Sequence, residues 1–161
     1  MRFVFGDIKN VTAITANQTH QGVIEVEDAA MFTMEFENGI LGSVSATNSS
    51  ATRWRTSLVC TGTAATLEYA NEKPIFIDAV SEELKNELET ALTPPAQEER
   101  IVGKSYYGSG HTAQIADVID AIENHRVPQV TLIDAINSSS LIMAVYESAR
   151  NNGAKTNVRK Y

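Results

Sequence analysis

The sequence has 161 residues, of which 43% are hydrophobic and 20% are charged. This length and composition suit one domain with a packed core and argue against a disordered chain. The 20 acidic residues outnumber the 13 lysines and arginines, and the net charge of −7 argues against binding to nucleic acid or to an anionic membrane. No apolar run approaches the roughly 18 residues of a membrane span, and the first residues do not resemble a signal peptide. Cys60 is the single cysteine, so no internal disulfide can form, and this favours the cytoplasm.

The first half of the chain has the alternation and the β-branched residues that are typical of strands. The strand-like segments are 11–16, 28–37, 40–47, 53–61, 65–69 and 74–78. Asn38-Gly39 separates two of them, and this pair predicts a hairpin with a two-residue type I′ turn. Such a loop pairs Thr33 with Val44. We therefore expect a meander of five or six antiparallel strands.

The second half changes to the period of amphipathic helices. Ser81 can cap a helix, and leucines recur at every fourth residue to position 92. A second apolar stripe follows from about residue 111 to 124. Thr131 with Asp134 resembles a capping box, although Asp is a weaker partner there than Glu. The sequence therefore predicts helices at 81–92, 111–124 and 131–150, the last of them stopped by the Asn-Asn-Gly run at 151–153.

Strands followed by helices predict the α+β class: a largely antiparallel sheet over residues 8–78, with the helices packed on one face. The expected register places Met31, Val44 and Ala46 on the face opposite Phe32 and Met34. Both faces are then partly apolar, and one layer of helices covers only one of them. Because an open apolar face usually marks an interface, we expect the chain to form a dimer or larger homo-oligomer through the open sheet face.

Few residues form a motif that indicates chemistry. The segment 108–113 fits G-x-G-x-x-A, a dinucleotide fingerprint where a buried parallel strand precedes it. The residues before it, 103–107, are polar, so a flexible glycine-rich start of a helix is the alternative. The three histidines are not spaced with cysteine or carboxylates as in a metal site, and no metal is expected.

Two places are candidates for ligand contact. Arg53-Trp54-Arg55 is a basic and aromatic cluster at the start of a strand. It can clamp a hydroxylated or anionic ligand, or it can form a surface ion pair beside a packed Trp. His111 follows a glycine loop at the start of a helix, where a side chain is accessible to a ligand.

Three parts of the sequence together resemble one family. Residues 26–42 (VEDAAMFTMEFENGILG) are similar to a hairpin of that family, and residues 58–67 (LVCTGTAATL) to a strand pair. Residues 111–128, Asp134 and residues 144–149 (AVYESA) are similar to its closing helices. The family is the glucose–fructose oxidoreductase / inositol dehydrogenase (Gfo/Idh/MocA) group of NAD(P)-dependent oxidoreductases. The resemblance covers nearly the whole chain, but only the C-terminal α/β domain of the family.

The resemblance implies that residues 1–161 are the substrate-binding and oligomerisation domain of a longer parent enzyme. That parent would transfer hydride between NAD or NADP and a sugar, cyclitol or related polyol. The family's Rossmann domain and its catalytic Asp and His have no counterpart in this sequence. We therefore expect no catalytic residue and no bound cofactor in this chain, which would be inactive alone. The candidates for substrate contact are Arg53, Trp54, Arg55, Tyr107 and His111.

Glu72-Lys73-Pro74 spells a motif that the family carries in its first domain, but here it lies between two strands. We therefore do not expect Lys73 to be a catalytic lysine, and the motif predicts an exposed turn before an edge strand.

Two other interpretations of the chain remain open. It can be a free-standing binding or dimerisation module without catalysis. A half-Rossmann fold built on the segment 108–113 would instead bind NAD directly.

Overall fold

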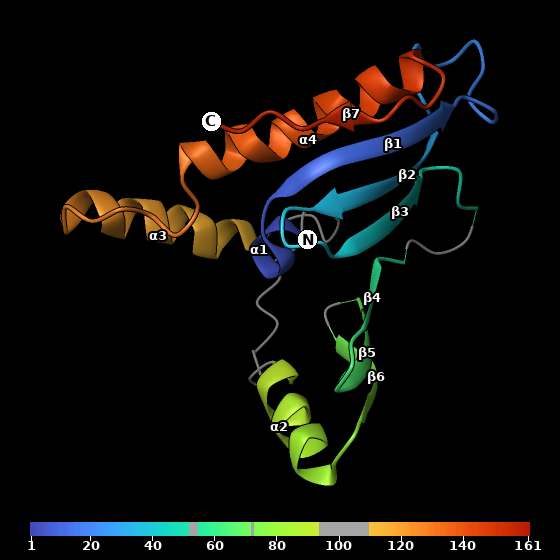
Figure 1. The fold of residues 1–161 in the computed structure, drawn as a ribbon. Helices are drawn as coiled ribbons and strands as arrows, with labels where there is room; N and C mark the ends of the chain where they lie inside the picture. Colours follow the sequence, from blue (N-terminus) through green and yellow to red (C-terminus); the bar gives the residue numbers. More distant parts are fainter. Residues whose placement is uncertain (52–54, 72, 94–109) are drawn as a thin grey trace. The chain divides into compact units, whose positions relative to one another are not determined.

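The computed structural model describes residues 1–51, 55–71, 73–93 and 110–161 (Figure 1). The chain forms two compact units. One consists of Met1–Ala51 with Gln114–Tyr161, and the other of Thr52–Ala113. Both combine helices with strands, and all the described strand pairs are antiparallel, so the predicted α+β class is confirmed.

The first unit contains a four-stranded sheet with the strand order β3-β2-β1-β7. Its strands are β1 (Ile8–Ala16), β2 (Ala29–Phe36), β3 (Leu41–Thr47) and β7 (Thr156–Asn157). Its helices are α1 (Arg2–Phe5), α4 (Leu132–Arg150) and most of α3 (Gly110–Glu123). The two-residue strand β7 was not predicted, because so short a segment shows no alternation.

The core of this unit lies between the sheet and α4, which packs along β1 (Figure 1). Alternate residues of β1 and β2 point toward α4, as the two-residue period of a strand requires. The buried cluster consists of Ile8, Val11, Ala13, Met34, Phe36, Ala144 and Val145. Phe5 closes one end of it, with its ring edge-on to Phe36 at a centroid distance of 5.6 Å. The helix therefore covers one face of the sheet.

The hairpin between β2 and β3 differs from the prediction by one residue. Phe36 donates its N–H to the carbonyl of Ile40 at 2.9 Å, and Gly39 donates to the carbonyl of Phe36 at 3.0 Å, so the loop has three residues. Of the Asn-Gly pair, only Gly39 has a positive φ, of 86°. A type I turn followed by one left-handed residue has this form, whereas a type I′ turn needs two. The Asn-Gly pair therefore serves a longer loop than expected.

This change of loop exchanges the two faces of β3. Phe32 pairs with Val44 and Ala30 with Ala46, so both β3 residues lie on the face that α4 covers. The prediction that they share the open face with Met31 was wrong. A shift of one residue in register moves every side chain of a strand to the opposite face.

The long helix α4 begins and ends as the sequence predicts. The Thr131 hydroxyl accepts the N–H of Asp134 at 3.1 Å, and the Asp134 carboxylate accepts the N–H of Thr131 at 3.1 Å. These two bonds confirm the capping box. After the helix, Asn152 and Gly153 have φ values of 57° and 75°, so the left-handed stop is also confirmed.

The second unit contains a separate three-stranded sheet. Its strands are β4 (Ser57–Thr61), β5 (Ala65–Ala70) and β6 (Lys73–Ala79), in that order, and α2 (Glu82–Leu92) packs on β6. The predicted single meander is thus divided into two sheets, because the polar segment 48–52 separates them. Lys73 is exposed and starts the edge strand β6, as the turn interpretation of its motif predicts. Ser81 caps α2 by accepting the N–H of Leu84 at 3.2 Å.

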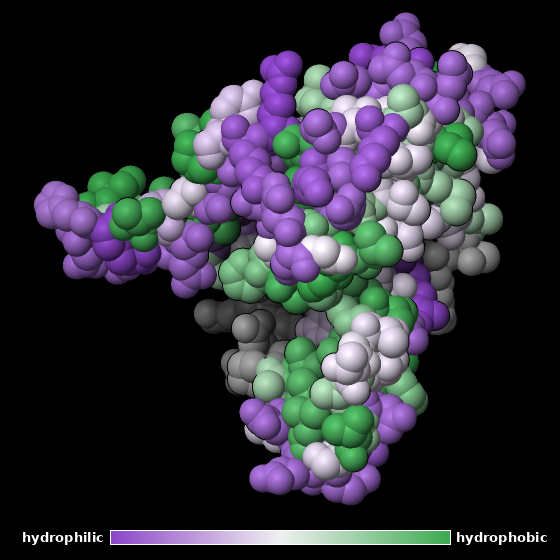
Figure 2. Space-filling model, viewed as in Figure 1, coloured by the Kyte–Doolittle hydropathy of each residue, from purple (hydrophilic) through white to green (hydrophobic). Residues whose placement is uncertain are grey.

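Helix α3 has the predicted apolar stripe, but much of that stripe is exposed at the surface (Figure 2). Its residues are Ile115, Val118, Ile119 and Ile122. The helix ends at a turn held by Arg126, whose guanidinium pairs with Asp117 at 2.7 Å. The hydrogen bond from the Gln129 N–H, followed by that from the Arg126 side chain, holds the pKa of Asp117 below its usual value.

Across the described ranges, the structure has no helix with the length and apolar character that a membrane span requires.

Candidate functional site

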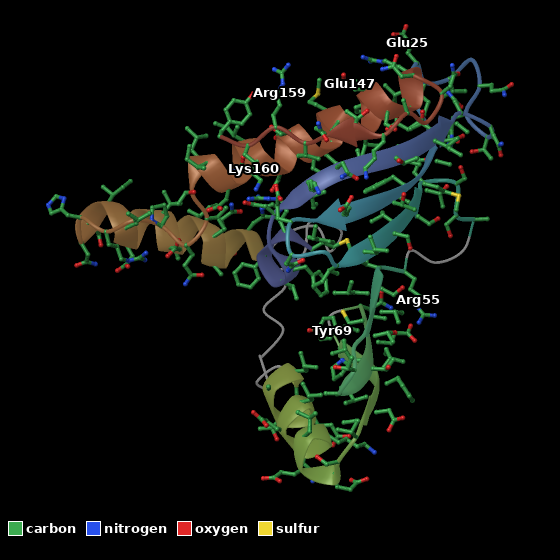
Figure 3. All side chains as sticks on the ribbon, viewed as in Figure 1. Glu25, Arg55, Tyr69, Glu147, Arg159 and Lys160 are labelled. Carbon is green, nitrogen blue, oxygen red and sulfur yellow. The ribbon has the colours of Figure 1, made fainter. Side chains whose placement is uncertain are left out.

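The structure describes two of the five residues predicted to contact a substrate. Arg53, Trp54 and Tyr107 lie outside the described residues. Arg55 is exposed just before β4, and its guanidinium pairs with the carboxylate of Glu68 on β5 (Figure 3). This ion pair is the structural alternative considered for Arg55. It leaves room for a ligand contact, because a guanidinium has five N–H donors.

His111 is the second residue of α3, and its side chain is exposed although it already has an interaction partner. The helix starts at Gly110, and the two residues of the fingerprint before it lie outside the described ranges. Every strand pair in the part of the chain that is described is antiparallel. The buried parallel strand that a dinucleotide fingerprint requires is therefore not among the described residues.

The open face of the first sheet carries short polar side chains with a few large apolar ones. One row across the strands consists of Ile14, Met31 and Ser45, and the next of Thr12, Thr33 and Ser43. All six side chains are exposed, Ile14 by 72% and Met31 by 62%. With Val44 and Ala46 on the other face, this surface is more polar than the sequence suggested.

Glu35 continues this face at the end near β7 and is held by three neighbours. Its carboxylate accepts from the Asn10 amide and from Lys155 Nζ, both at 2.9 Å, and pairs with Lys9 Nζ at 3.4 Å. The hydrogen bond from Asn10, together with the charge and hydrogen bond of Lys155, lowers the pKa of Glu35 from 4.5 to about 2. Glu35 is therefore an anion that joins three segments distant in sequence. No local pattern predicts this cluster, because Lys155 lies 120 positions after Glu35.

A buried acid, Asp28, organises the loop between β1 and β2. The Asp28 carboxylate accepts backbone N–H groups of Gln18, Thr19 and His20 at 2.6–3.1 Å. Burial alone would raise the pKa of Asp28, but these hydrogen bonds outweigh it and hold the pKa well below its usual range. His20 Nδ1 lies 3.3 Å from the same carboxylate, and the nearby Ser49 hydroxyl contacts Thr19. The arrangement fits a loop anchor better than a Ser-His-Asp relay.

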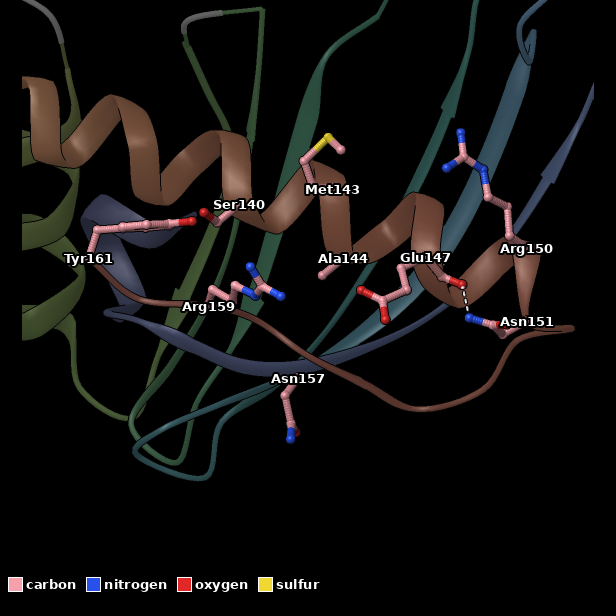
Figure 4. Close-up of a pocket in the computed structure, with 9 residues that line it drawn as sticks. All are labelled: Ser140, Met143, Ala144, Glu147, Arg150, Asn151, Asn157, Arg159 and Tyr161. Atoms are coloured by element: carbon pink, nitrogen blue, oxygen red, sulfur yellow. Dashed lines mark hydrogen bonds between the residues drawn. The ribbon is translucent and has the colours of Figure 1, made fainter.

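A groove of about 600 Å³ lies between α4 and the C-terminal segment of the chain (Figure 4). Its lining residues are Ser140, Met143, Ala144, Glu147, Arg150, Asn151, Asn157, Arg159 and Tyr161. Most are polar or charged, and nothing in the sequence brought them to notice because they come from two segments. In the described ranges, no three His, Cys, Asp or Glu side chains are grouped as a metal site would require.

Residues 1–158 match the C-terminal alpha/beta domain of a known oxidoreductase family. A search of the curated proteins gave no match. The fold is similar to that of the WlbA dehydrogenase from Bordetella pertussis, solved with NADH and UDP-GlcNAcA (TM-score 0.76, 20% identity). It is also similar to that of levoglucosan dehydrogenase, solved with NADH and levoglucosan (TM-score 0.76, 19% identity). A third similar structure is an oxidoreductase from Agrobacterium radiobacter, solved with NAD+, L-tartaric acid and magnesium (TM-score 0.69, 19% identity).

These alignments cover 98–99% of this chain but only 44–47% of the other chains. The chain thus spans a little under half the length of these structures. At about 20% sequence identity, the similar structures show that the fold is shared. The family is shown by the sequence match, which covers residues 1–158. The chain therefore belongs to the Gfo/Idh/MocA oxidoreductase family, as the C-terminal alpha/beta domain of that family.

Proposed function

We propose that this chain is the substrate-binding and oligomerisation domain of a cytoplasmic NAD(P)-dependent oxidoreductase that acts on a sugar, cyclitol or related polyol. The family match over residues 1–158 is the observation that carries the proposal. The similar structures support it, because they are about twice as long and were solved with NADH or NAD+. Two of them also hold a sugar-type ligand.

The described residues do not fit a nicotinamide dinucleotide. Their strands are antiparallel, whereas the dinucleotide fingerprint needs a parallel strand ahead of the helix. We therefore assign the dinucleotide and the proton transfer to other residues of the parent enzyme. The part left to this chain is to bind and orient the substrate.

Arg55 and His111 are the described residues to which we assign substrate contact, together with Arg53, Trp54 and Tyr107. Arg55 is exposed at the start of β4, and its partner Glu68 leaves some of its N–H donors free to bind hydroxyl oxygens. His111 is exposed at the start of α3, where an imidazole can donate to or accept from a polyol hydroxyl. In both roles the side chain binds a hydroxyl of the substrate and takes no part in the chemical reaction.

Self-association through the open sheet face is the second part of the proposal. Ile14, Met31 and Leu41 are 72%, 62% and 79% exposed on that face. Between them lie rows of Thr and Ser, whose short side chains allow a second sheet to approach closely. A twofold contact would bring the same rows together from both copies.

A hybrid enzyme tests the assignment. This chain replaces the C-terminal half of levoglucosan dehydrogenase, behind the half of that enzyme that remains. We expect the hybrid to bind NADH, seen as a saturable change in nucleotide fluorescence, and to reduce NAD+ with at least one sugar, cyclitol or polyol of a panel. This chain alone should show no saturable NADH signal.

The same experiment separates the alternatives. A hybrid that binds NADH but oxidises no member of the panel would favour the free-standing module without catalysis. Saturable NADH binding by this chain alone would favour the half-Rossmann interpretation. In an active hybrid, His111→Ala and Arg55→Ala should raise KM more than they lower kcat, because each removes substrate binding rather than a reacting group.

A further inference from the structure

Three charged side chains line the groove between α4 and the C-terminal segment: Glu147, Arg150 and Arg159. The Arg150 guanidinium lies over the ring of Tyr146, 5.8 Å from its centroid. Glu147 and Arg159, by contrast, pair neither with each other nor with any other described residue. Glu147 projects from α4 and Arg159 from the segment after β7, and both side chains reach into the same space (Figure 4). The volume of about 600 Å³ lies within the usual range of small-molecule sites. The groove is thus large enough for a ligand and has two charged groups available to it.

Two basic residues near Arg159 in the sequence form ion pairs, whereas Arg159 does not pair with any described acid. Lys160, the next residue, pairs with Glu37 at 2.8 Å, and Lys155 pairs with Glu35 at 2.9 Å. Since the chain carries a net charge of −7, acidic partners are abundant. Among the described residues, Arg159 has neither an acidic partner nor an aromatic ring like the one beneath Arg150, and this sets it apart within the groove.

Neutral groups complete the groove and offer hydrogen bonds. Ser140 and Tyr161 supply hydroxyls, and the buried Ala144 lies between Glu147 and Arg159 (Figure 4). Asn157 also borders the groove, but its side chain points away from α4 (Figure 4).

We propose that this groove binds a small zwitterion of the amino-acid class, with its carboxylate on the Arg159 guanidinium and its ammonium on the Glu147 carboxylate. A guanidinium matches the planar geometry of a carboxylate with two parallel N–H bonds, and the carboxylate of Glu147 is a direct partner for an ammonium. A simple anion would meet repulsion from Glu147, and a simple cation would meet repulsion from Arg159. A neutral polyol would leave both charges without a counter-charge. A ligand with both charges satisfies the groove best.

Amide NMR of the full chain tests this site with three probes: L-glutamine, acetate and ethanolamine. We expect glutamine to shift the amide resonances of Asn157, Arg159 and Tyr161 in a saturable way, with a Kd of about 1 mM or below. Acetate and ethanolamine carry one charge each and should bind at least about tenfold more weakly. Arg159→Gln and Glu147→Gln should each weaken glutamine binding by about tenfold or more.

Two matched variants control for a general change in charge. Lys73→Gln and Glu89→Gln alter exposed residues of β6 and α2 and should leave glutamine binding unchanged. The same spectra report folding, so a variant that has lost structure is recognised from its lost dispersion, and Arg159→Lys then replaces Arg159→Gln. The proposal is wrong if glutamine gives no saturable shift in the groove. It is also wrong if acetate binds as tightly as glutamine, or if the groove and control variants behave alike.

Discussion

The hydroxyl of Ser148 accepts the backbone N–H of Ala13 at 2.9 Å, deep in the interface between α4 and β1. Strand β7 pairs with β1 only at residues 10 and 11, so the ladder ends before Ala13. The same hydroxyl donates to the carbonyl of Ala154 at 2.7 Å, and Ser148 is fully buried. The Ser148 hydroxyl therefore supplies the hydrogen bond to Ala13 that β7 does not make. It also holds Ala154, in the segment just after α4, close to β1.

Ser148→Ala should lower the free energy of unfolding by about 2 kcal/mol, because it leaves a buried N–H and a carbonyl without partners. Urea denaturation measures the change. Ser139→Ala, on the exposed side of the same helix, is the matched control and should change stability by less than about 0.5 kcal/mol. Equal effects of the two substitutions would contradict the bridging role of Ser148.

Gly39→Ala should destabilise the chain by about 1 kcal/mol, because an alanine side chain is strained at positive φ. A Cβ added at Gly39 meets no atom within 4 Å, so the cost comes from the backbone conformation alone. Gly110→Ala is the control, since its added Cβ is equally free and its φ is not positive. Thermal denaturation should show a lower Tm for the first variant and not for the second. A matching loss in both would mean that the hairpin loop does not require a left-handed residue.

Stability should fall with acid in a way that depends on Glu35. Its pKa is lowered from 4.5 to about 2 in the folded chain, so its stabilising contribution is fully present above the unfolded value and is lost as the pH falls between these two values. Glu35→Gln should flatten this part of the curve of unfolding free energy against pH. Glu89→Gln, on exposed α2, should keep the wild-type slope. A Glu35→Gln curve parallel to that of wild type would show that the three-way cluster does not form.

The sequence predicted the elements better than their pairing. The capping box at Thr131 and the glycine stop at 153 are local signals, and both ends of α4 were correct because of them. The register of β3 was wrong, because Asn38-Gly39 fits loops of two or three residues equally well. Nothing in the sequence indicated the groove, because Glu147 and Arg159 belong to different segments that only the fold brings together.

Met31→Glu should shift the chain from dimer toward monomer in sedimentation velocity, because it places a charge in the middle of the open sheet face. Val44 is unsuitable for this test, since it packs against the core beneath α4. Val23→Glu alters an exposed loop residue of the same unit and should leave the dimer intact. A wild-type chain that sediments as a monomer at high micromolar concentration would defeat the proposed self-association.

Substrate preference is the property that this chain should carry with it into another enzyme. The measurement compares kcat/KM across a panel of sugars, cyclitols and polyols for levoglucosan dehydrogenase and for the hybrid whose C-terminal half is this chain, with the same nicotinamide cofactor. If this chain binds and orients the substrate, the hybrid should prefer a different member of the panel, and His111→Ala should lower kcat/KM for that member. A hybrid that binds NADH as its parent does and still prefers levoglucosan would contradict the assignment of substrate binding to this chain.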